Sequence, residues 1–166
     1  HVFGGTLLLI GILSHIVVTC STAFTSMEPN TFGTIFILMG FLINAAAPPL
    51  SAWLSDAYPE ASFSGAVFLS AFTTKAAVYV LLRGFPGSEV LIFIGVFMIF
   101  YGIIYALLEN DMRRILAYSI VNQVGFMVTG VGIGTEMALN GVAAHAFTHI
   151  IYLSLIHISE PTRLTM

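Results

Sequence analysis

The chain contains a single lysine, Lys75, and it lies where a charge is costly. It stands in an apolar run, residues 61–82, that holds no other charged residue and is long enough to cross a bilayer as a helix. An ammonium at membrane depth costs on the order of 3 kcal/mol on insertion scales, so it is rarely there for stability. Lys75 therefore indicates an ion or proton pathway. The alternative is a lysine that extends to the membrane interface, which lies about 10 Å away along the helix axis.

Two histidines near the end of the chain have a spacing that suits proton transfer. His145 and His149 are four residues apart, so on a helix both point to one face. Imidazole titrates near physiological pH, which is the property that a proton relay needs. The alternative is a pair of interior histidines that are hydrogen-bonded to the backbone.

The second apolar run is interrupted near its middle. Asn44, Pro48 and Pro49 lie there, and a short amphipathic segment, LSAWLSDAYPEA (50–61), follows. Proline removes a backbone donor, and in lipid the freed carbonyls need partners from protein or from water in a cavity. Interrupted spans in transporters mark the ion or substrate site. The sequence therefore predicts a broken helix here, with an ordinary proline kink as the alternative.

The composition places the whole chain in a membrane. It is 58% hydrophobic and 8% charged with a mean hydropathy of +0.98, whereas soluble domains carry about 25% charged residues. Apolar runs recur along the chain with short connections, so we predict one all-α polytopic membrane domain with about six spanning helices. The runs cover residues 2–24, 32–50, 61–82, 90–108, 115–133 and 138 onward.

No pattern typical of a soluble enzyme is present. The glycines of GVGIGTE (130–136) follow a predicted helix and lack the acidic ribose partner of a dinucleotide-binding loop. The sequence shows no carboxylate pair, metal-ligand set or nucleophile–base arrangement, and Cys20 is the only cysteine. We therefore expect no covalent catalysis and no cofactor in this chain, and no nucleic-acid partner.

Three segments in one collinear order resemble the proton-conducting antiporter family. This family includes the D-type subunit of Mrp cation/proton antiporters and the antiporter-like membrane subunits of respiratory complex I. The segments are FLINAAAPPLSAWLSDAYPEASFSGAVFLSAFTTKAAVYVLLR (41–83), LENDMRRILAYSIVNQVGFM (108–127) and LNGVAAHAFTHIIY (139–152).

The resemblance implies an architecture and a setting. Family members form bundles of about fourteen helices built from two inverted repeats, each with a broken helix and buried charges. Residues 1–152 would form part of such a bundle. The implied partners are the lipid bilayer, other membrane subunits of a hetero-oligomeric antiporter or respiratory complex, protons and possibly Na⁺. The implied location is the bacterial plasma membrane.

The resemblance also assigns roles to individual residues. Lys75 matches the family lysine on the helix after the break, whereas Asn44 stands where many members carry another lysine. An amide donates and accepts hydrogen bonds but does not titrate. Gln123 stands where complex I members often have histidine, and Ser51 and Ser55 depart from the commoner pattern of the second half-helix. The carboxylate that the family pairs with a buried lysine is expected upstream of His1.

These observations favour proton/cation translocation by a chain similar to the D-type subunit of Mrp antiporters. The pathway would consist of water, Asn44, Lys75, His145 and His149, with Pro48 and Pro49 forming the helix break. Two alternatives remain. One is a proton-pumping membrane subunit of an NADH:quinone oxidoreductase or membrane hydrogenase, whose redox sites lie in partner chains. The other is a solute carrier or a structural bundle.

The last part of the chain has a separate resemblance. LSLIHISEPTR (153–163) resembles the translation of a transposase-type sequencing adapter. We therefore predict that residues 153–166 are not native, so that His157, Glu160 and Arg163 carry no function. The family commonly continues the pattern of His145 and His149 with a lysine, and we expect the natural sequence to have one after Tyr152.

Overall fold

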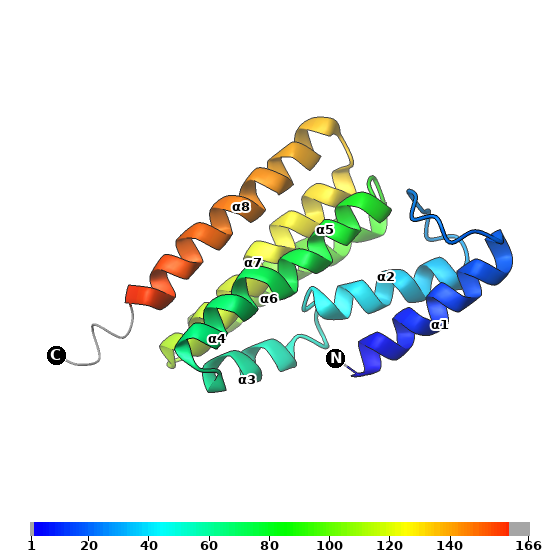
Figure 1. Cartoon of the computed structure of the whole chain (residues 1–166). Helices are drawn as coiled ribbons and strands as arrows, with labels where there is room; N and C mark the ends of the chain where they lie inside the picture. The colour runs from blue at the N-terminus through cyan, green and yellow to red at the C-terminus, as the bar shows by residue number, and fades with distance from the viewer. Residues whose placement is uncertain (1, 160–166) are drawn as a thin grey trace.

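The computed structural model is built of helices and short connections (Figure 1). It describes residues 2–159, except for the side chains of residues 63, 64, 154 and 156–159, and it has no strand within that range. The expected all-α class is therefore confirmed. The elements are α1 Val2–Thr19, α2 Phe32–Asn44, α3 Ala52–Glu60, α4 Phe63–Phe68, the π-helical turn η1 Leu69–Thr73, α5 Thr74–Gly84, α6 Glu89–Leu108, α7 Met112–Ile133 and α8 Glu136–Ser159.

Four helical segments among the described residues are long and apolar enough to cross a membrane. α4, η1 and α5 run on as one of these segments. The predicted number of about six spans is not confirmed, because α2 has only 13 residues and α8, although 24 residues long, is not among the four. A straight span needs about 20 apolar residues, and α2 ends early at the helix break. The four segments are Val2–Thr19, Gly65–Gly84, Glu89–Leu108 and Met112–Ile133.

Two helix pairs, α1 with α2 and α6 with α7, pack closely through glycines. A Cβ atom at Gly11 would lie 2.7 Å from the backbone nitrogen of Ile37, and one at Gly125 would lie 2.9 Å from the Gly95 carbonyl oxygen. Small residues allow this backbone approach, which is a common way for membrane helices to associate. Each of the four helices carries two glycines seven residues apart: Gly4 and Gly11, Gly33 and Gly40, Gly95 and Gly102, and Gly125 and Gly132.

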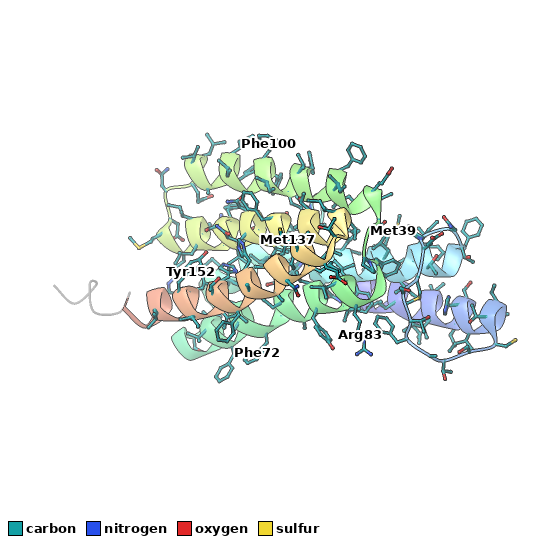
Figure 2. All side chains as sticks on the ribbon, turned by 90° about the horizontal axis from the view of Figure 1, so that it is seen from above. Met39, Phe72, Arg83, Phe100, Met137 and Tyr152 are labelled. Carbon is teal, nitrogen blue, oxygen red and sulfur yellow. The ribbon has the colours of Figure 1, made fainter. Side chains whose placement is uncertain are left out.

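α7 is the central helix of the larger group. It packs against α6, α8, α3 and α5, and its buried side chains include Ile120, Val124 and Val128. The outer surface is apolar as well. Figure 2 shows Phe100 of α6 and Phe72 of η1 pointing away from the bundle on opposite sides, and both side chains are exposed. An apolar outer surface is what a bilayer requires.

The predicted break in the second apolar run is present. α2 ends at Asn44, and helix resumes at Ala52 in α3. In the turn between them, Ala46 has a φ of 62°, a left-handed conformation that is costly for a residue with a Cβ atom. The indole N–H of Trp53 donates to the Ile43 carbonyl at 3.1 Å, so one of the last carbonyls of α2 has a partner from the second half-helix.

Local residues define the start of α4 and both ends of α7. The Ser62 hydroxyl accepts from the Gly65 amide at 3.2 Å at the start of α4. The Asp111 carboxylate accepts from the Arg113 amide at 3.0 Å at the start of α7. Both are ordinary N-cap contacts, and Gly134, with a φ of 71°, ends α7 in the left-handed conformation that favours glycine.

Candidate functional site

Lys75 is a buried charge held by its own helix. It is the second residue of α5, directly after η1, and its side chain is 7% exposed. Its Nζ donates to the Ser70 carbonyl at 2.7 Å. The ammonium is thus bound by a backbone carbonyl of the π-helical turn, inside the Gly65–Gly84 span. A lysine that extends to the membrane interface would be exposed, so that alternative does not describe this side chain.

The π-helical turn presents two successive carbonyls to side chains. The Tyr58 hydroxyl of α3 donates to the Leu69 carbonyl at 2.8 Å, and the next carbonyl, that of Ser70, accepts from Lys75. Single π-helical turns are rare and occur frequently at functional sites. Thr74 follows the turn, is fully buried, and its hydroxyl has no hydrogen-bond partner among the described residues.

The two predicted histidines lie on one face of α8. Nε2 of His145 lies 2.8 Å from Oε1 of Gln123 on α7, a hydrogen bond that the imidazole donates to the amide oxygen. The rings of His145 and His149 are 6.3 Å apart between centroids. The His149 ring is 5.0 Å from that of Tyr152, which Figure 2 labels on the same helix.

His149 is the most deeply buried of these polar groups. Its side chain is 0% exposed, and within residues 2–159 neither ring nitrogen has a hydrogen-bond partner. Buried polar groups in proteins normally do have one. An imidazole in this position can therefore bind a further polar group or a water molecule, which is a requirement for a proton relay.

The fold brings Lys75 and the two histidines into one interior region. α8, which carries both histidines, packs against η1 and α5, which carry the Ser70 carbonyl and Lys75. Asn44 lies on a neighbouring element. It is the last residue of α2, it is half-buried, and α2 packs against α5. Pro48 and Pro49 lie in the turn after it, where Pro48 is half-buried and Pro49 is exposed.

Three residues that make hydrogen bonds in this region, Gln123, Tyr58 and Ser70, were not among the predicted site residues. Gln123 stood out in the sequence only as a departure from the family pattern, and Tyr58 and Ser70 did not stand out at all. An amide inside an apolar run is the signal that could have marked Gln123, and its hydrogen bond to His145 accounts for that amide. No local signal exists for the other two. The contact of Tyr58 depends on how α3 crosses the π-helical turn, and Ser70 contributes its backbone carbonyl, which its residue type does not reveal.

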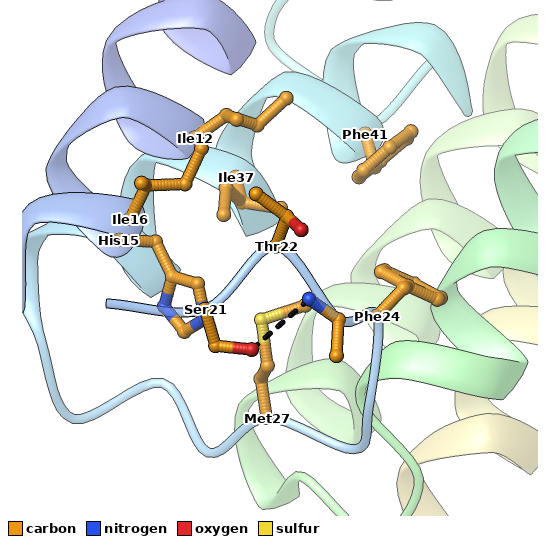
Figure 3. Close-up of a pocket in the computed structure, with 10 residues that line it drawn as sticks. Ile12, His15, Ile16, Ser21, Thr22, Phe24, Met27, Ile37 and Phe41 are labelled. Carbon is orange, nitrogen blue, oxygen red and sulfur yellow. Dashed lines mark hydrogen bonds between the residues drawn. The ribbon is translucent and has the colours of Figure 1, made fainter. Parts of the chain in front are cut away.

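A separate pocket lies between α1, α2 and the segment that joins them (Figure 3). Its volume is about 240 Å³, and its lining is mostly apolar, with His15 and Met27 among the contributing side chains. A hydrogen bond of 3.2 Å from the Ala23 amide to the Ser21 hydroxyl orders the connecting segment at its edge. α1 and α8 lie on opposite sides of the molecule (Figure 1), so this pocket is distinct from the region around His149.

The fold and the site define an all-helical membrane domain with a broken helix and a buried lysine on the span that follows. The chain belongs to the family described as NADH:quinone oxidoreductase/Mrp antiporter, TM, which matches residues 1–159. The resemblance seen in the three sequence segments is therefore confirmed, and the chain is an integral membrane protein. The match extends past Tyr152, and the foreign origin of residues 153–166 stays a prediction; residues 160–166 lie outside the described part of the chain.

The relatives come from both branches of this family. The chain is 31% identical over 136 residues to the M subunit of NADH-quinone oxidoreductase from Pseudomonas aeruginosa, a match that covers 75% of the chain and 27% of that protein. It is 33% identical over 132 residues to the D subunit of the Na(+)/H(+) antiporter from Alkalihalophilus pseudofirmus, a match that covers 74% of the chain and 26% of that protein. The chain thus spans about a quarter of the length of the curated relatives that it matches.

A solved structure has the same fold. The chain superposes on part of the Mrp complex from Dietzia sp. DQ12-45-1b with a TM-score of 0.86 at 24% sequence identity. The superposition covers 95% of this chain and 32% of the matched chain. At this identity the likeness supports the antiporter-like arrangement of the helices and no more.

Proposed function

We propose that the chain is part of an antiporter subunit, similar to the D-type subunit of Mrp antiporters, that exchanges protons for a cation such as Na⁺ across a membrane. One observation carries the proposal. A buried ammonium, Lys75, is bound by a carbonyl of the π-helical turn, and the buried His149 packs in the same region with both ring nitrogens able to bind further groups.

The chemistry in this proposal is the movement of protons between polar groups. The Lys75 ammonium donates, the imidazoles of His145 and His149 both donate and accept, and the Gln123 amide fixes the orientation of the first imidazole. Asn44 would contribute hydrogen bonds at the helix break. The chain would work without a cofactor of its own, because only bonds to protons are made and broken.

The setting belongs to the same proposal. The relatives are named as subunits, so we infer that this chain also works with further membrane subunits. The membrane would be the bacterial plasma membrane, and the transported ions would be protons and Na⁺. The name of the P. aeruginosa relative favours a subunit of a redox-driven complex, and the name of the A. pseudofirmus relative favours a subunit of an antiporter.

One experiment separates these two. The full-length protein is produced with its partner subunits, and inverted membrane vesicles are prepared with a fluorescent pH indicator. A collapse of an imposed pH gradient on addition of Na⁺ supports the antiporter. Proton uptake that starts only with NADH and a quinone supports the respiratory machine instead, and vesicles that show neither response would overturn both.

A further inference from the structure

The short helix α3 is tied to three other parts of the molecule by side-chain hydrogen bonds. Trp53 donates to the Ile43 carbonyl at the end of α2, and Tyr58 donates to the Leu69 carbonyl in η1. At the far end, Nη1 of Arg113, from the start of α7, donates to the Pro59 carbonyl at 2.8 Å. The half-helix after the break therefore contacts the π-helical turn directly, one residue before the carbonyl that binds Lys75.

Tyr58 is fixed where it makes this contact. Its side chain is 4% exposed, and its ring lies 6.2 Å from that of Trp53 in an edge-to-face arrangement at 71°. Aromatic pairs of this geometry are favourable beyond the area that they bury. The hydroxyl is thus held at one place on the neighbouring span, where it donates to the Leu69 carbonyl and also has a side-chain hydrogen bond with Thr73, both residues of η1.

The π-helical turn determines where the Lys75 side chain points. A π-helical turn holds one residue more than an α-helical turn, so every residue after it is displaced by about 100°, the rotation of one α-helical residue. Lys75 is two residues beyond the end of η1. If η1 became α-helical, the Lys75 side chain would leave the side of the span that now faces the Ser70 carbonyl.

A π-helical turn persists where side chains compensate for it. Side chains that insert into the backbone ladder are a recognised cause of local departures from α-helix. Here Tyr58 donates to the Leu69 carbonyl and Lys75 donates to the Ser70 carbonyl. The first contact comes from α3 and the second from the same span, and both stabilise the π-helical turn.

We propose that Tyr58 is a positioning residue for Lys75: its hydroxyl holds η1 in the π-helical form and thereby keeps the ammonium on the Ser70 carbonyl. The inference rests on the proposed function, in which Lys75 takes part in ion transfer. It adds the route by which the broken helix acts on that lysine, through α3 and Tyr58. A displacement of α3 at the break would therefore change the position of the Lys75 ammonium.

The test removes the hydroxyl and then restores a donor. Tyr58→Phe is compared with p-aminophenylalanine at the same position and with Tyr79→Phe, an exposed tyrosine on α5, in the full-length protein with its partner subunits. We expect Tyr58→Phe to lower the maximal transport rate about tenfold, the upper end of what one hydrogen bond contributes. The apparent affinity for the cation is expected to stay unchanged, p-aminophenylalanine to restore the rate, and Tyr79→Phe to have no effect.

A second measurement follows the position of residue 75 without using transport. The background is cysteine-free, which requires Cys20→Ser in this chain, and Lys75→Cys introduces one reactive thiol. The rate at which a small maleimide labels this thiol is compared between the protein with Tyr58 and the protein with Tyr58→Phe. We expect the labelling rate to change at least threefold when the hydroxyl is lost, because a rotation of about 100° moves the side chain to another surface of the span.

The outcomes separate this inference from the proposed function. Unchanged labelling, or wild-type transport in Tyr58→Phe while Lys75→Met is inactive, would overturn the positioning role alone. Wild-type transport in Lys75→Met would remove the lysine from the pathway, whatever Tyr58 does. If Tyr58→Phe fails to accumulate in the membrane and p-aminophenylalanine restores only the amount of protein, the hydrogen bond serves folding and the inference is wrong.

Discussion

The Lys75 ammonium has three donors, and the Ser70 carbonyl accepts one of them at 2.7 Å. A carbonyl is a weaker partner for an ammonium than a carboxylate, because its oxygen carries only a partial charge and does not neutralise the ammonium. The lysine is therefore held without being locked in place. His149, buried nearby with two open ring nitrogens, has the same property. Groups that keep hydrogen-bonding capacity in an apolar interior are suited to exchange protons.

Lys75→Ala in the full-length protein is expected to reduce ion transport at least tenfold and to leave membrane insertion intact. Removing a buried charge relieves an insertion cost, so a folding defect is not expected. The measurement is the rate of gradient collapse in vesicles, normalised to the amount of protein. Arg83→Gln, at the end of the same helix, is the control and should transport normally. Wild-type rates in Lys75→Ala would exclude Lys75 from the mechanism.

Asn44→Lys is expected to be tolerated, because family members place an ammonium at the matching position. Asn44 is the last residue of α2 and is half-buried, so a longer side chain has room at the helix break. A second ammonium in the interior would change the coupling between proton and cation, which the ratio of the two fluxes measures. A variant that does not accumulate in the membrane would show that the residues around the break are wrongly matched to the family.

At the scale of elements, the molecule combines tightly packed long helix pairs with a short half-helix, α3. The glycines of α1 with α2 and of α6 with α7 bring backbones together over two helical turns. α3, by contrast, has only nine residues. Trp53 near its start and Tyr58 and Pro59 near its end make hydrogen bonds to α2, η1 and α7, and the helix packs against α7. A short helix has few backbone hydrogen bonds of its own, so α3 is the element that we expect to open first.

Arg113→Gln is expected to loosen the far end of α3. The Arg113 guanidinium donates to the Pro59 carbonyl, and hydrogen bonds with a charged donor contribute about 1.5–3 kcal/mol. Protection of α3 amides against hydrogen exchange should therefore fall at least tenfold, with little change in α6 and α7. Arg114→Gln, one residue on and exposed, is the matched control. Equal effects of the two variants would show that positive charge, and not the contact with Pro59, is responsible.

Gly125→Ala is expected to destabilise the α6–α7 pair. Its Cβ atom would lie 2.9 Å from the Gly95 carbonyl oxygen and from the Ile99 nitrogen, both backbone atoms that cannot rotate away. Overpacking of this kind costs about 1–3 kcal/mol. Gly141→Ala on α8 is the control, because nothing lies within 4 Å of its Cβ position, and it should leave stability equal or slightly higher. Thermal unfolding in detergent measures both, and equal melting temperatures for the two variants would contradict the close packing.

For the molecule as a whole, the sequence predicted the features that individual residues reveal. A charge in an apolar run, two prolines in a span and two histidines four residues apart can each be recognised without tertiary contacts, and the structure places Lys75, the break and the histidine face accordingly. The π-helical turn could not be predicted, since ASFSGAVFLSAFTTKAAVYVLL is typical of one regular helix and the turn depends on Tyr58 from another element. The number of about six spans is not confirmed for a related reason: apolar runs do not show that a broken helix stops after 13 residues.

The position after Tyr152 connects the site to the rest of α8. Leu153 is 1% exposed and lies four residues beyond His149, so it continues the face that His145 and His149 define. In the family pattern a lysine commonly follows the two histidines at this spacing, and Leu153 is also the first residue of the adapter-like segment. A lysine at position 153 would add a second ammonium to the buried region around His149, where the proposed proton transfer needs titratable groups. We therefore expect unamplified source DNA, sequenced across the codons for Tyr152 and Leu153, to encode a lysine after Tyr152. Recovery of LSLIHISEPTR from that template would show that the segment is native and that the histidine face ends in an apolar residue.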